Sequence, residues 1–466
     1  MKADTDRSIE TGSCAQWAAR LAGRLQAARG QAGPGAGDVL LRATLRLERI
    51  APLDWLVHEG GRERFYGATR QRSAAIEIGG WGVADEAVWP EACGWREVMD
   101  VLRARLAAAA PGVRYYGGFR FAPSQPPDED WAAFGAARFI VPRLELVATP
   151  EDSLLSLHAR PAEIDDGTVD AVLERLAAMT FTAGGAPDGV PVPLARRDHP
   201  DRSGWNRNVE AVLSDCRQGR LSKVVLARKA DFLFADPLDP VALLRRLKAA
   251  TPDCFHFCYM PDADTAFVGA SPERLYRREG TQLMTEAVAG TRMRGAGAEE
   301  DRRLGRALLE SDKEQREHRL VRDGIREALQ PLCAGLEIDP APQLQQLARS
   351  QHLYSAFHGE LRPGVDDADL LAALHPTAAL GGSPTAAALA RIAELEPFDR
   401  GWYAGPVGWV APEAAEFAVA IRSGLVRPRK LSLFSGAGIV QGSTPDREWE
   451  EIELKICDFI KVLTAS

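Results

Sequence analysis

Two acidic segments carry glutamates at the spacing of a single helix face. Glu314 and Glu317 are three residues apart in SDKEQREHRL. Glu448, Glu451 and Lys455 follow the i, i+3, i+7 pattern in DREWEEIELK. Residues at these spacings share one face of a helix, and four carboxylates from two helices could bind a hard cation such as Mg²⁺. Spacing alone favours a simpler interpretation, which is a solvated face with a Glu451–Lys455 ion pair.

Lys223 and Glu273 have the residue types of a general base and a general acid. The chain holds eight lysines among its 57 lysines and arginines, and Lys223 lies at the start of the strand-like segment SKVVLARK. A lysine at a strand end that faces an enclosed pocket can be kept neutral by desolvation and can then accept a proton. Glu273 follows Ser-Pro in GASPERL, where proline restricts the backbone. Without further evidence, an edge lysine and a surface turn are the more common explanations.

The segment FSGAGIVQGS (434–443) predicts a glycine-rich turn after a strand. Its spacing is GxGxxxG, and the helix that it would open begins only after Pro445. Both features differ from the dinucleotide-binding pattern GxGxxG, so a Rossmann site is not favoured. Backbone amides in this segment could still bind a carboxylate.

The segment CFHFC (254–258) resembles a metal-binding clip because a histidine lies between two cysteines. Alternation along a strand would place Cys254, His256 and Cys258 on one face. No second Cys/His pair follows at the spacing of a zinc site, so we interpret these cysteines as structural.

The composition fits a globular protein and excludes several other classes. Of 466 residues, 45% are hydrophobic and 26% are charged, which excludes disorder over most of the chain. The net charge of −8 argues against a general nucleic-acid-binding protein. No run approaches the length of an apolar membrane span, and the acidic start MKADTDRSIE does not resemble a signal peptide. Seven thinly spread cysteines favour a reducing compartment, so we expect a cytoplasmic protein.

The first two parts of the chain are predicted to differ in structure. Residues 1–38 contain a helix around 15–28 and then a flexible, glycine-rich turn. Residues 39–200 form a strand-rich half, in which short alternating runs indicate antiparallel strands. Its strands are expected near 39–50, 64–70, 73–84 and 137–147, its helices near 95–109 and 168–179, and a long loop over 182–200.

Residues 201–466 form a third part, in which helices alternate with strands and hairpins. Helices are expected near 207–217, 299–329 and 446–463, and strands near 223–234, 256–260, 265–279, 282–295, 419–426 and 430–442. Hairpin signals outnumber clean βαβ units, so the pattern predicts an α+β fold rather than a doubly wound sheet.

Ten motifs follow one another in an order that resembles the chorismate-utilising enzymes, a family that includes anthranilate synthase, aminodeoxychorismate synthase, isochorismate synthase and salicylate synthase. The motifs are SKVVLARK, GASPERL, AVAGTR, KEQREHRLV, SQHLYS, HPTAALGG, GWYAGPVGW, AIRSGL, SGAGIVQGS and EWEEIELK. In the first half, RFYGATR, VRYYGGFRF and RFIVPRLEL resemble strand segments of the isochorismate synthase branch. The family implies one large α+β domain with two stacked antiparallel sheets, outer helices and an active site in the crevice between the sheets.

The resemblance also implies roles for residues of this chain. Lys223 resembles the base that activates a water molecule beside C2 of chorismate, and Glu273 resembles the acid that protonates the leaving C4 hydroxyl. The metal-ligand positions are Glu317 and Glu451, which resemble direct Mg²⁺ ligands, and Glu314 and Glu448, which resemble ligands that act through water. The substrate-binding positions are Gly290, Thr291, His352, Ala379, Leu380, Tyr403, Arg422, Gly436, Gly438 and Lys455.

These roles favour an Mg²⁺-dependent isochorismate synthase, an isomerase that adds water at C2 of chorismate and expels the C4 hydroxyl. Amino-transferring relatives typically carry glutamine where this chain has Lys223, so we expect no glutaminase partner. Salicylate synthase, which continues by eliminating pyruvate from isochorismate, is the main alternative. Such enzymes tend to have a loop of the type HPxxTxxG, whereas this chain reads HPTAALGG and has the apolar pair Ala379 and Leu380 from the fifth position on.

A catalytically silent binding subunit is the alternative from a different class of function. It is the least favoured, because every matched position holds a chemically competent residue. The resemblance further implies a monomer whose partner is the small molecule chorismate, without nucleic acid or membrane.

Overall fold

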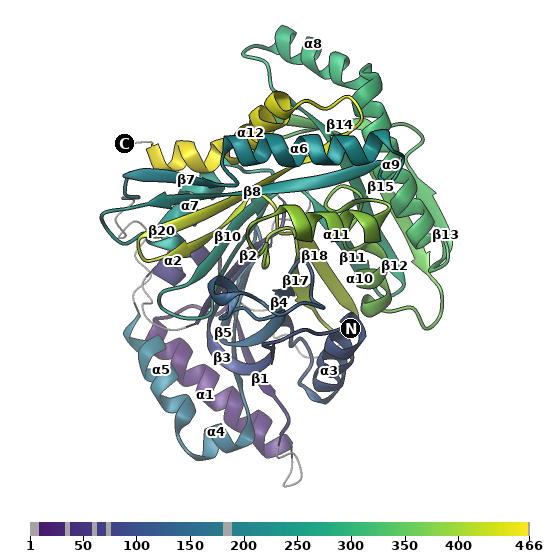
Figure 1. Ribbon diagram of the computed structural model, residues 1–466. Coiled ribbons are helices and arrows are strands. Elements are labelled where there is room, and N and C mark those ends of the chain that lie inside the picture. The colour runs from purple at the N-terminus through teal and green to yellow at the C-terminus, as the bar shows by residue number, and fades with distance from the viewer. Residues whose placement is uncertain (1–8, 33–37, 58–62, 71–75, 180–188, 465–466) are drawn as a thin grey trace.

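The computed structural model describes residues 9–32, 38–57, 63–70, 76–179 and 189–464 (Figure 1). Figure 1 shows a large twisted sheet with most helices on its outside. The helices are α1 (Cys14–Gln31), α2 (Pro52–Val57), α3 (Trp95–Ala108), α4 (Pro161–Asp165), α5 (Thr168–Ala178), α6 (Arg202–Arg217), α7 (Pro240–Ala250), α8 (Ala298–Leu309), α9 (Asp312–Leu329), α10 (Asp367–Leu374), α11 (Thr385–Leu395) and α12 (Pro445–Thr464).

The strands are β1 (Leu41–Glu48), β2 (Arg64–Ala68), β3 (Glu77–Trp89), β4 (Tyr115–Phe119), β5 (Ala137–Ala148), β6 (Asp152–Ala159), β7 (Ala195–His199), β8 (Lys223–Leu233), β9 (Phe255–Met260), β10 (Ala266–Ser271), β11 (Arg274–Glu279), β12 (Gln282–Met293), β13 (Cys333–Ile338), β14 (Gln343–Gln346), β15 (Ser350–Leu361), β16 (Gly382–Ser383), β17 (Pro406–Val410), β18 (Ala414–Val419), β19 (Ser423–Arg427) and β20 (Lys430–Val440).

All these strands join in one antiparallel network. From β8 the order runs through β20, β19, β10, β9, β2 and β3 to β5. Beyond β5 it continues through β4, β17, β18, β11 and β12 to β15, while β6 and β1 extend from another part of β5. The α+β fold with stacked antiparallel layers is confirmed, and the layers are two halves of one continuous sheet.

Aromatic side chains fill the space between the two halves of the sheet. The Tyr259 hydroxyl of β9 donates to the carbonyl oxygens of Gly117 in β4, at 2.8 Å, and of Gly408 in β17, at 3.3 Å. Trp402 lies against Tyr259 and Phe267, with ring centroids 5.4 and 6.4 Å apart. Because the two halves share this apolar layer, the parts of the chain before and after residue 200 fold as one body.

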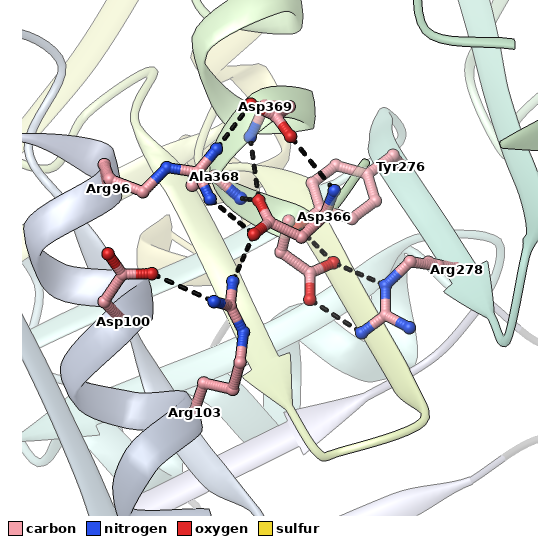
Figure 2. A network of polar contacts seen from close by, with 9 residues as sticks. Arg96, Asp100, Arg103, Tyr276, Arg278, Asp366, Ala368 and Asp369 are labelled. Atoms are coloured by element: carbon pink, nitrogen blue, oxygen red, sulfur yellow. Dashed lines mark hydrogen bonds and ion pairs between the residues drawn. The ribbon is translucent and has the colours of Figure 1, made fainter. Parts of the chain in front are cut away.

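The first and last thirds of the chain are also joined at the surface by a network of ion pairs (Figure 2). Arg96 and Arg103 of α3 both donate to Asp366, which caps the N-terminus of α10. On the inner side, Arg278 of β11 donates to both carboxylate oxygens of Asp367, at 2.8 and 2.7 Å. The network therefore fixes α10 against α3 and β11.

The predicted helices near 15–28, 95–109, 168–179, 207–217 and 446–463 are confirmed as α1, α3, α5, α6 and α12. The predicted single helix over 299–329 is wrong, because the chain breaks into α8 and α9. Ser311 has an extended backbone there and precedes the first residue of α9. The break gives α9 a direction of its own, and its first turn carries the acidic residues Asp312 and Glu314.

Two further predictions fail near the C-terminus. The predicted strand over 419–426 is divided, because β18 ends at Val419 and Arg422 adopts a positive φ of 50° before β19 begins. The predicted turn over 434–443 lies mainly inside β20, which pairs with β8 as far as Val440. A dinucleotide-binding turn is therefore excluded, because the glycines belong to a strand.

The predicted loops are only partly described. Residues 33–37 of the first turn and residues 180–188 of the long loop lie outside the described residues. The end of the predicted long loop is a strand, β7, which pairs with β8. The division of the chain at residues 38 and 200 stays a prediction.

The CFHFC segment is a buried strand rather than a metal clip. Burial raises the pKa of the Cys254 and Cys258 thiols to about 12, and it lowers the pKa of His256 to about 3. The His256 ring shares a hydrogen bond of 3.0 Å with the Thr251 hydroxyl. These contacts agree with structural cysteines and a neutral histidine.

None of the described helices combines the length and the apolar character needed to cross a membrane.

Gly401, in the segment that leads to Tyr403, provides a test of this packing. Its φ is +52°, and a Cβ atom there would lie 1.9 Å from the Trp131 ring. We expect Gly401→Ala to lower the free energy of unfolding by about 2 kcal/mol or more, because the left-handed backbone and the overlap both oppose a side chain. Chemical denaturation measures this change.

Gly324→Ala in α9 is the matched control, because a Cβ at Gly324 has no atom within 4 Å. Alanine should keep or increase stability there, since it favours a helix by roughly 1 kcal/mol over glycine. Equal stability of wild type and Gly401→Ala would contradict the described packing around Trp131.

Candidate active site

A pocket with an empty volume of about 830 Å³ lies between the sheet and helices α9 and α12. Fifteen of the sixteen site residues predicted from the sequence line it: Lys223, Glu273, Gly290, Thr291, Glu314, Glu317, His352, Ala379, Leu380, Tyr403, Arg422, Gly436, Gly438, Glu451 and Lys455. The sixteenth, Glu448, lies one turn before Glu451 on α12, and its side chain is buried. The structure therefore brings the predicted residues together, while their chemical roles stay predictions.

A buried ion pair joins β8 to α9 inside this pocket. Lys223 is the first residue of β8 and is 1% exposed, and its Nζ donates to Oε1 of Glu317 at 2.8 Å. Gly438 of β20 lies beside this pair, where a Cβ would be 2.7 Å from Lys223 Cε and 3.0 Å from Glu317 Oε1. The close approach requires a glycine, which explains one residue of the glycine-rich segment.

Glu273 follows Pro272 in the tight connection between β10 and β11. Its backbone amide donates to the Ser271 hydroxyl at 3.2 Å, and its carbonyl accepts from the Val419 amide at 3.1 Å. Burial and the nearby negative charge of Glu286 raise the pKa of Glu273 to about 8, although Lys223 acts in the opposite direction. Glu273 is therefore a buried acid that holds its proton at neutral pH.

The acidic faces of α9 and α12 meet lysines at the pocket. Lys455 Nζ donates to Glu451 Oε1 at 2.6 Å, and Lys313 Nζ lies 3.5 Å from Glu448 Oε1. Burial acts to raise the pKa of Glu451, but Lys455 outweighs it and the pKa lies below its usual value. The predicted helix faces and the predicted Glu451–Lys455 ion pair are both present. The face is not simply solvated, because Glu448 is buried and Glu451 lines the pocket.

The other two glutamates on these helix faces, Glu314 and Glu448, have raised pKa values. Burial and the charge of Glu317 raise the pKa of Glu314, and burial and the charge of Glu451 raise the pKa of Glu448. Both lie in the first turn of their helix, where the helix dipole favours an anion. The site thus holds four carboxyl groups on α9 and α12, against the three lysines Lys223, Lys313 and Lys455.

A β-bulge shapes the wall next to α9. The register of β12 against β15 shifts between Ala289 and Thr291, and Gly290 at the shift has a φ of 75°. A Cβ on Gly290 would lie 3.0 Å from Glu314 Oε2. The bulge therefore lets the strand approach the carboxylate, at the kind of position where bulges occur beside active sites.

His352 stands opposite the bulge on β15 and is uncharged. Its Nδ1 lies 3.0 Å from the Thr291 hydroxyl, and its Nε2 lies 3.2 Å from the Ser350 hydroxyl. Burial and the positive charges of Arg422 and Lys455 lower the pKa of His352 to about 3. We therefore expect a neutral hydrogen-bonding group here and not a cation.

Cationic and aromatic side chains form another part of the wall. Arg422, held at a positive φ in the turn between β18 and β19, donates to the backbone oxygen of Lys455 at 3.2 Å. The Tyr403 ring stacks on Phe434 with centroids 5.2 Å apart, and burial raises the pKa of its hydroxyl to about 12. The turn that the sequence analysis missed is thus what directs this arginine into the pocket.

The backbone of β20 offers hydrogen-bond donors to the pocket. β19 pairs with β20 only as far as Phe434. Beyond Phe434, β19 no longer covers the edge of β20 that faces away from β8. Lys455 Nζ donates to the carbonyl oxygen of Gly436 at 2.9 Å, so the backbone groups of Gly436 point out of this edge toward Lys455. Because strand residues two apart face the same edge, the amides of Gly436 and Gly438 are directed there as well.

Sequence reasoning missed several residues that line or support the pocket. Lys313, which pairs with Glu448, could have been found, because it is one of eight lysines and lies inside the acidic segment. Val225, Pro272, Ile421, Phe434 and Ser435 also line the pocket, and only the three-dimensional arrangement reveals them.

The four glutamates fit a divalent cation by their chemistry, although they are not assembled around one point. Among the residues that the structure describes, no group of three or more His, Cys, Asp or Glu side chains is arranged to hold a metal ion. Buried Glu448 Oε1 accepts no hydrogen bond, although the Lys313 ammonium lies 3.5 Å away, and carboxylate oxygens are the ligands that Mg²⁺ prefers. The glutamates therefore suit a hard cation, which would take the place of their present contacts with Lys223, Lys313 and Lys455.

A family profile described as chorismate binding enzyme matches residues 27–464, almost the whole chain. The chain belongs to the chorismate-binding enzyme family. This chorismate-binding enzyme is 40% identical over 358 residues to the salicylate biosynthesis isochorismate synthase of Pseudomonas aeruginosa. The match covers 76% of this chain and 74% of the Pseudomonas protein.

Two other comparisons of this chorismate-binding enzyme also match isochorismate synthases. Its structure matches that of MenF, the menaquinone-specific isochorismate synthase from Escherichia coli, with a TM-score of 0.79, 29% identity and coverage of 95% of this chain and 100% of that one. It is 35% identical over 379 residues to isochorismate synthase 2, chloroplastic, of Arabidopsis thaliana. That match covers 79% of this chain but 66% of the plant protein, so the chain spans just under two thirds of that relative.

The raised pKa of Glu273 can be measured in the free protein. The carboxyl carbon of Glu273, identified in a ¹³C NMR spectrum by its absence from Glu273→Gln, should titrate near pH 8. Glutamate in water titrates at about 4.3, and burial disfavours the anion, so the group stays neutral until the pH rises to about 8. Glu286→Gln, which removes a nearby negative charge, should lower this value. Titration of Glu273 below pH 5 would contradict the described burial.

Proposed function

We propose that this chorismate-binding enzyme is an isochorismate synthase, an isomerase that converts chorismate to isochorismate. One observation carries this proposal. A buried lysine, Lys223, and a glutamic acid that keeps its proton at neutral pH, Glu273, line the same pocket. A base and an acid in one site suit the addition of water at one ring carbon and the loss of a hydroxyl from another.

The substrate is a dianion, and the pocket holds groups that bind carboxylates. Arg422 and Lys455 provide positive charge, and the amides of Gly436 and Gly438 provide backbone donors along the free edge of β20. Charge-assisted hydrogen bonds of this kind are short and directional. They would hold the carboxylates of chorismate and fix the ring for reaction.

In the proposed reaction, the oxygen of a water molecule bonds to C2 while Lys223 Nζ takes a proton from it. The ring double bond shifts, the C4–oxygen bond breaks, and Glu273 gives its proton to the departing hydroxyl, which leaves as water. One water enters and one leaves, so the product is an isomer of the substrate. Lys223 acts as the base in its neutral form, so it first releases one proton to solvent. In the structure its Nζ donates a hydrogen bond to Glu317.

Glu317 and Glu451 are the residues that would hold Mg²⁺, with Glu314 and Glu448 acting through water. A bound divalent cation supplies positive charge that offsets the ring carboxylate and orients the substrate. The excess of carboxylates over lysines in this part of the pocket supports the proposal.

We propose that the reaction stops at isochorismate. Ala379 and Leu380 form an apolar part of the pocket wall and offer no hydroxyl near the ring. Salicylate synthase activity, in which pyruvate is eliminated next, is the alternative, and the base, acid and metal positions do not distinguish the two.

The remaining proposals rest on the composition and the family resemblance as well as on the site. The enzyme acts on free chorismate in the cytoplasm as a monomer and without a glutaminase subunit. Lys223 supports the last point, since a lysine in this position suits water rather than ammonia as the nucleophile.

Incubation with chorismate and Mg²⁺, followed by chromatographic identification of the product, tests the function. Wild type should form isochorismate. Lys223→Ala should lose about 10²- to 10⁴-fold in turnover rate, because the general base is removed, but it should still bind chorismate. Lys229→Ala is the matched control on the same strand, because Lys229 does not line the pocket and lies 3.6 Å from Asp130.

Two outcomes would contradict this assignment. An aminated product formed with ammonium salts would show that ammonia is the nucleophile. Stoichiometric release of pyruvate, followed with lactate dehydrogenase, would assign salicylate synthase activity instead.

The metal requirement is a separate prediction. Removal of divalent cations with EDTA should abolish turnover, and added Mg²⁺ should restore it. Glu317→Gln and Glu451→Gln should each raise the Mg²⁺ concentration for half-maximal activity, because each removes a carboxylate ligand. Glu450→Gln, an exposed neighbour on α12, should behave as wild type. Full activity of the metal-free enzyme would show that these carboxylates have another role.

A further inference from the structure

One edge of β8 has a gap between its two neighbouring strands. β16 pairs with residues 223–224, and β7 pairs with residues 229–233. Between them, Val225 and Ala227 face the same edge, because Val225 N donates to the carbonyl oxygen of Gly381 at 2.9 Å. Buried backbone groups in such a gap need other partners.

A buried ion pair fills this gap. Glu396 and Arg400 have side chains that are 3% and 4% exposed, and Arg400 donates to both carboxylate oxygens of Glu396, at 2.8 and 2.5 Å. Glu396 Oε1 also accepts from the Ala227 amide at 2.7 Å, and Arg400 Nη2 donates to the Val225 carbonyl at 2.7 Å. The pair therefore takes the place of a neighbouring strand.

The same guanidinium reaches the apolar wall of the pocket. Arg400 Nη1 donates to the carbonyl oxygen of Leu380 at 3.2 Å. Its plane lies over the Phe121 ring, 4.4 Å from the centroid, and Phe121 N donates to Gly401 O at 2.7 Å. Leu380 and Val225 both line the pocket, so one side chain ties the wall to the strand that begins with Lys223.

We propose that Arg400 is a positioning residue for the reaction. It fixes the distance between the Leu380 wall and the β8 strand that carries Lys223, and so holds the ring of the substrate in the geometry for attack by water. This inference rests on the proposed function, because it takes chorismate as the substrate. A displacement of about 1 Å in such a wall can change a reaction rate by roughly 10²-fold.

Arginine suits this position better than lysine. A guanidinium carries five N–H donors in one plane, so it can bind the Glu396 carboxylate and two carbonyl oxygens together. A lysine would keep the charge but could not reach all three partners in one plane. Arg400→Lys therefore removes the positioning function while keeping a cation beside Glu396.

A purely structural role for Arg400 is the competing explanation. A second buried ion pair, outside the pocket, allows a positioning role to be distinguished from a structural one. Arg278 donates to both oxygens of Asp367 (Figure 2), and neither residue lines the pocket. Arg278 is 9% exposed and Asp367 is 6% exposed, so the pair is similarly buried. Arg278→Lys thus serves as a matched control. It should lower the stability of the fold without moving the pocket wall at Leu380.

The test compares Arg400→Lys and Arg278→Lys at a temperature where both are folded by circular dichroism. We expect Arg400→Lys to lower kcat/KM for chorismate by about 10- to 100-fold and to release more pyruvate per turnover than wild type. Arg278→Lys should keep kcat and KM within about two-fold of wild type, even if its thermal midpoint falls equally. Kinetic constants of Arg400→Lys that match those of Arg278→Lys would overturn the inference.

Hydrogen–deuterium exchange gives a readout that does not depend on the reaction. The amides of Leu380 and Gly381, which donate to the Thr377 carbonyl at 3.0 Å, should exchange faster in Arg400→Lys than in Arg278→Lys or wild type. Unchanged exchange would overturn the positioning role even if wild type makes isochorismate. Conversely, a wild-type product other than isochorismate would contradict the proposed function alone.

A milder variant covers the case in which Arg400→Lys does not fold. Phe121→Leu removes the aromatic ring under the guanidinium but leaves its hydrogen bonds intact. It should lower kcat/KM several-fold and increase exchange at Leu380 and Gly381. Wild-type values for both measurements would overturn the inference.

Discussion

The ion pair between Lys223 and Glu317 is the contact on which the active site depends. It buries an ammonium group that is 1% exposed, and a charge in that position needs an opposite charge and good hydrogen-bond geometry. The pair brings the first residue of β8 to the acidic face of α9, and Gly438 of β20 leaves room for it. A strand end, a helix and a neighbouring strand are therefore positioned by one contact.

Unequal charge around this pair gives the pocket two different environments. Near α9 and α12, glutamates outnumber lysines, and the raised pKa values of Glu314 and Glu448 show the cost of holding those anions together. Near β11, burial and Glu286 keep Glu273 protonated. A dianionic substrate suits such a site only when a cation offsets the carboxylates, while a neutral acid remains available to the leaving group.

The sequence predicts the site residues better than the geometry that joins them. Helix periodicity alone placed Glu314 with Glu317 and Glu448 with Glu451, because that spacing is local. It could not reveal the turn at Arg422, since a positive φ depends on how β18 and β19 meet. Nor could it reveal the Glu396–Arg400 pair. Its partners on β8, Val225 and Ala227, lie about 170 residues earlier in the chain, and they contact the pair because β16 and β7 leave a gap along β8.

Turnover of chorismate in H₂¹⁸O tests most directly whether water attacks C2 in this pocket. The proposed roles of Lys223 and Glu273 predict isochorismate with one ¹⁸O atom, located on C2 by mass spectrometry, and release of the original C4 oxygen to the solvent. Isochorismate that carries unlabelled oxygen at C2 would contradict this account, because the hydroxyl would then have moved within the substrate without a water nucleophile.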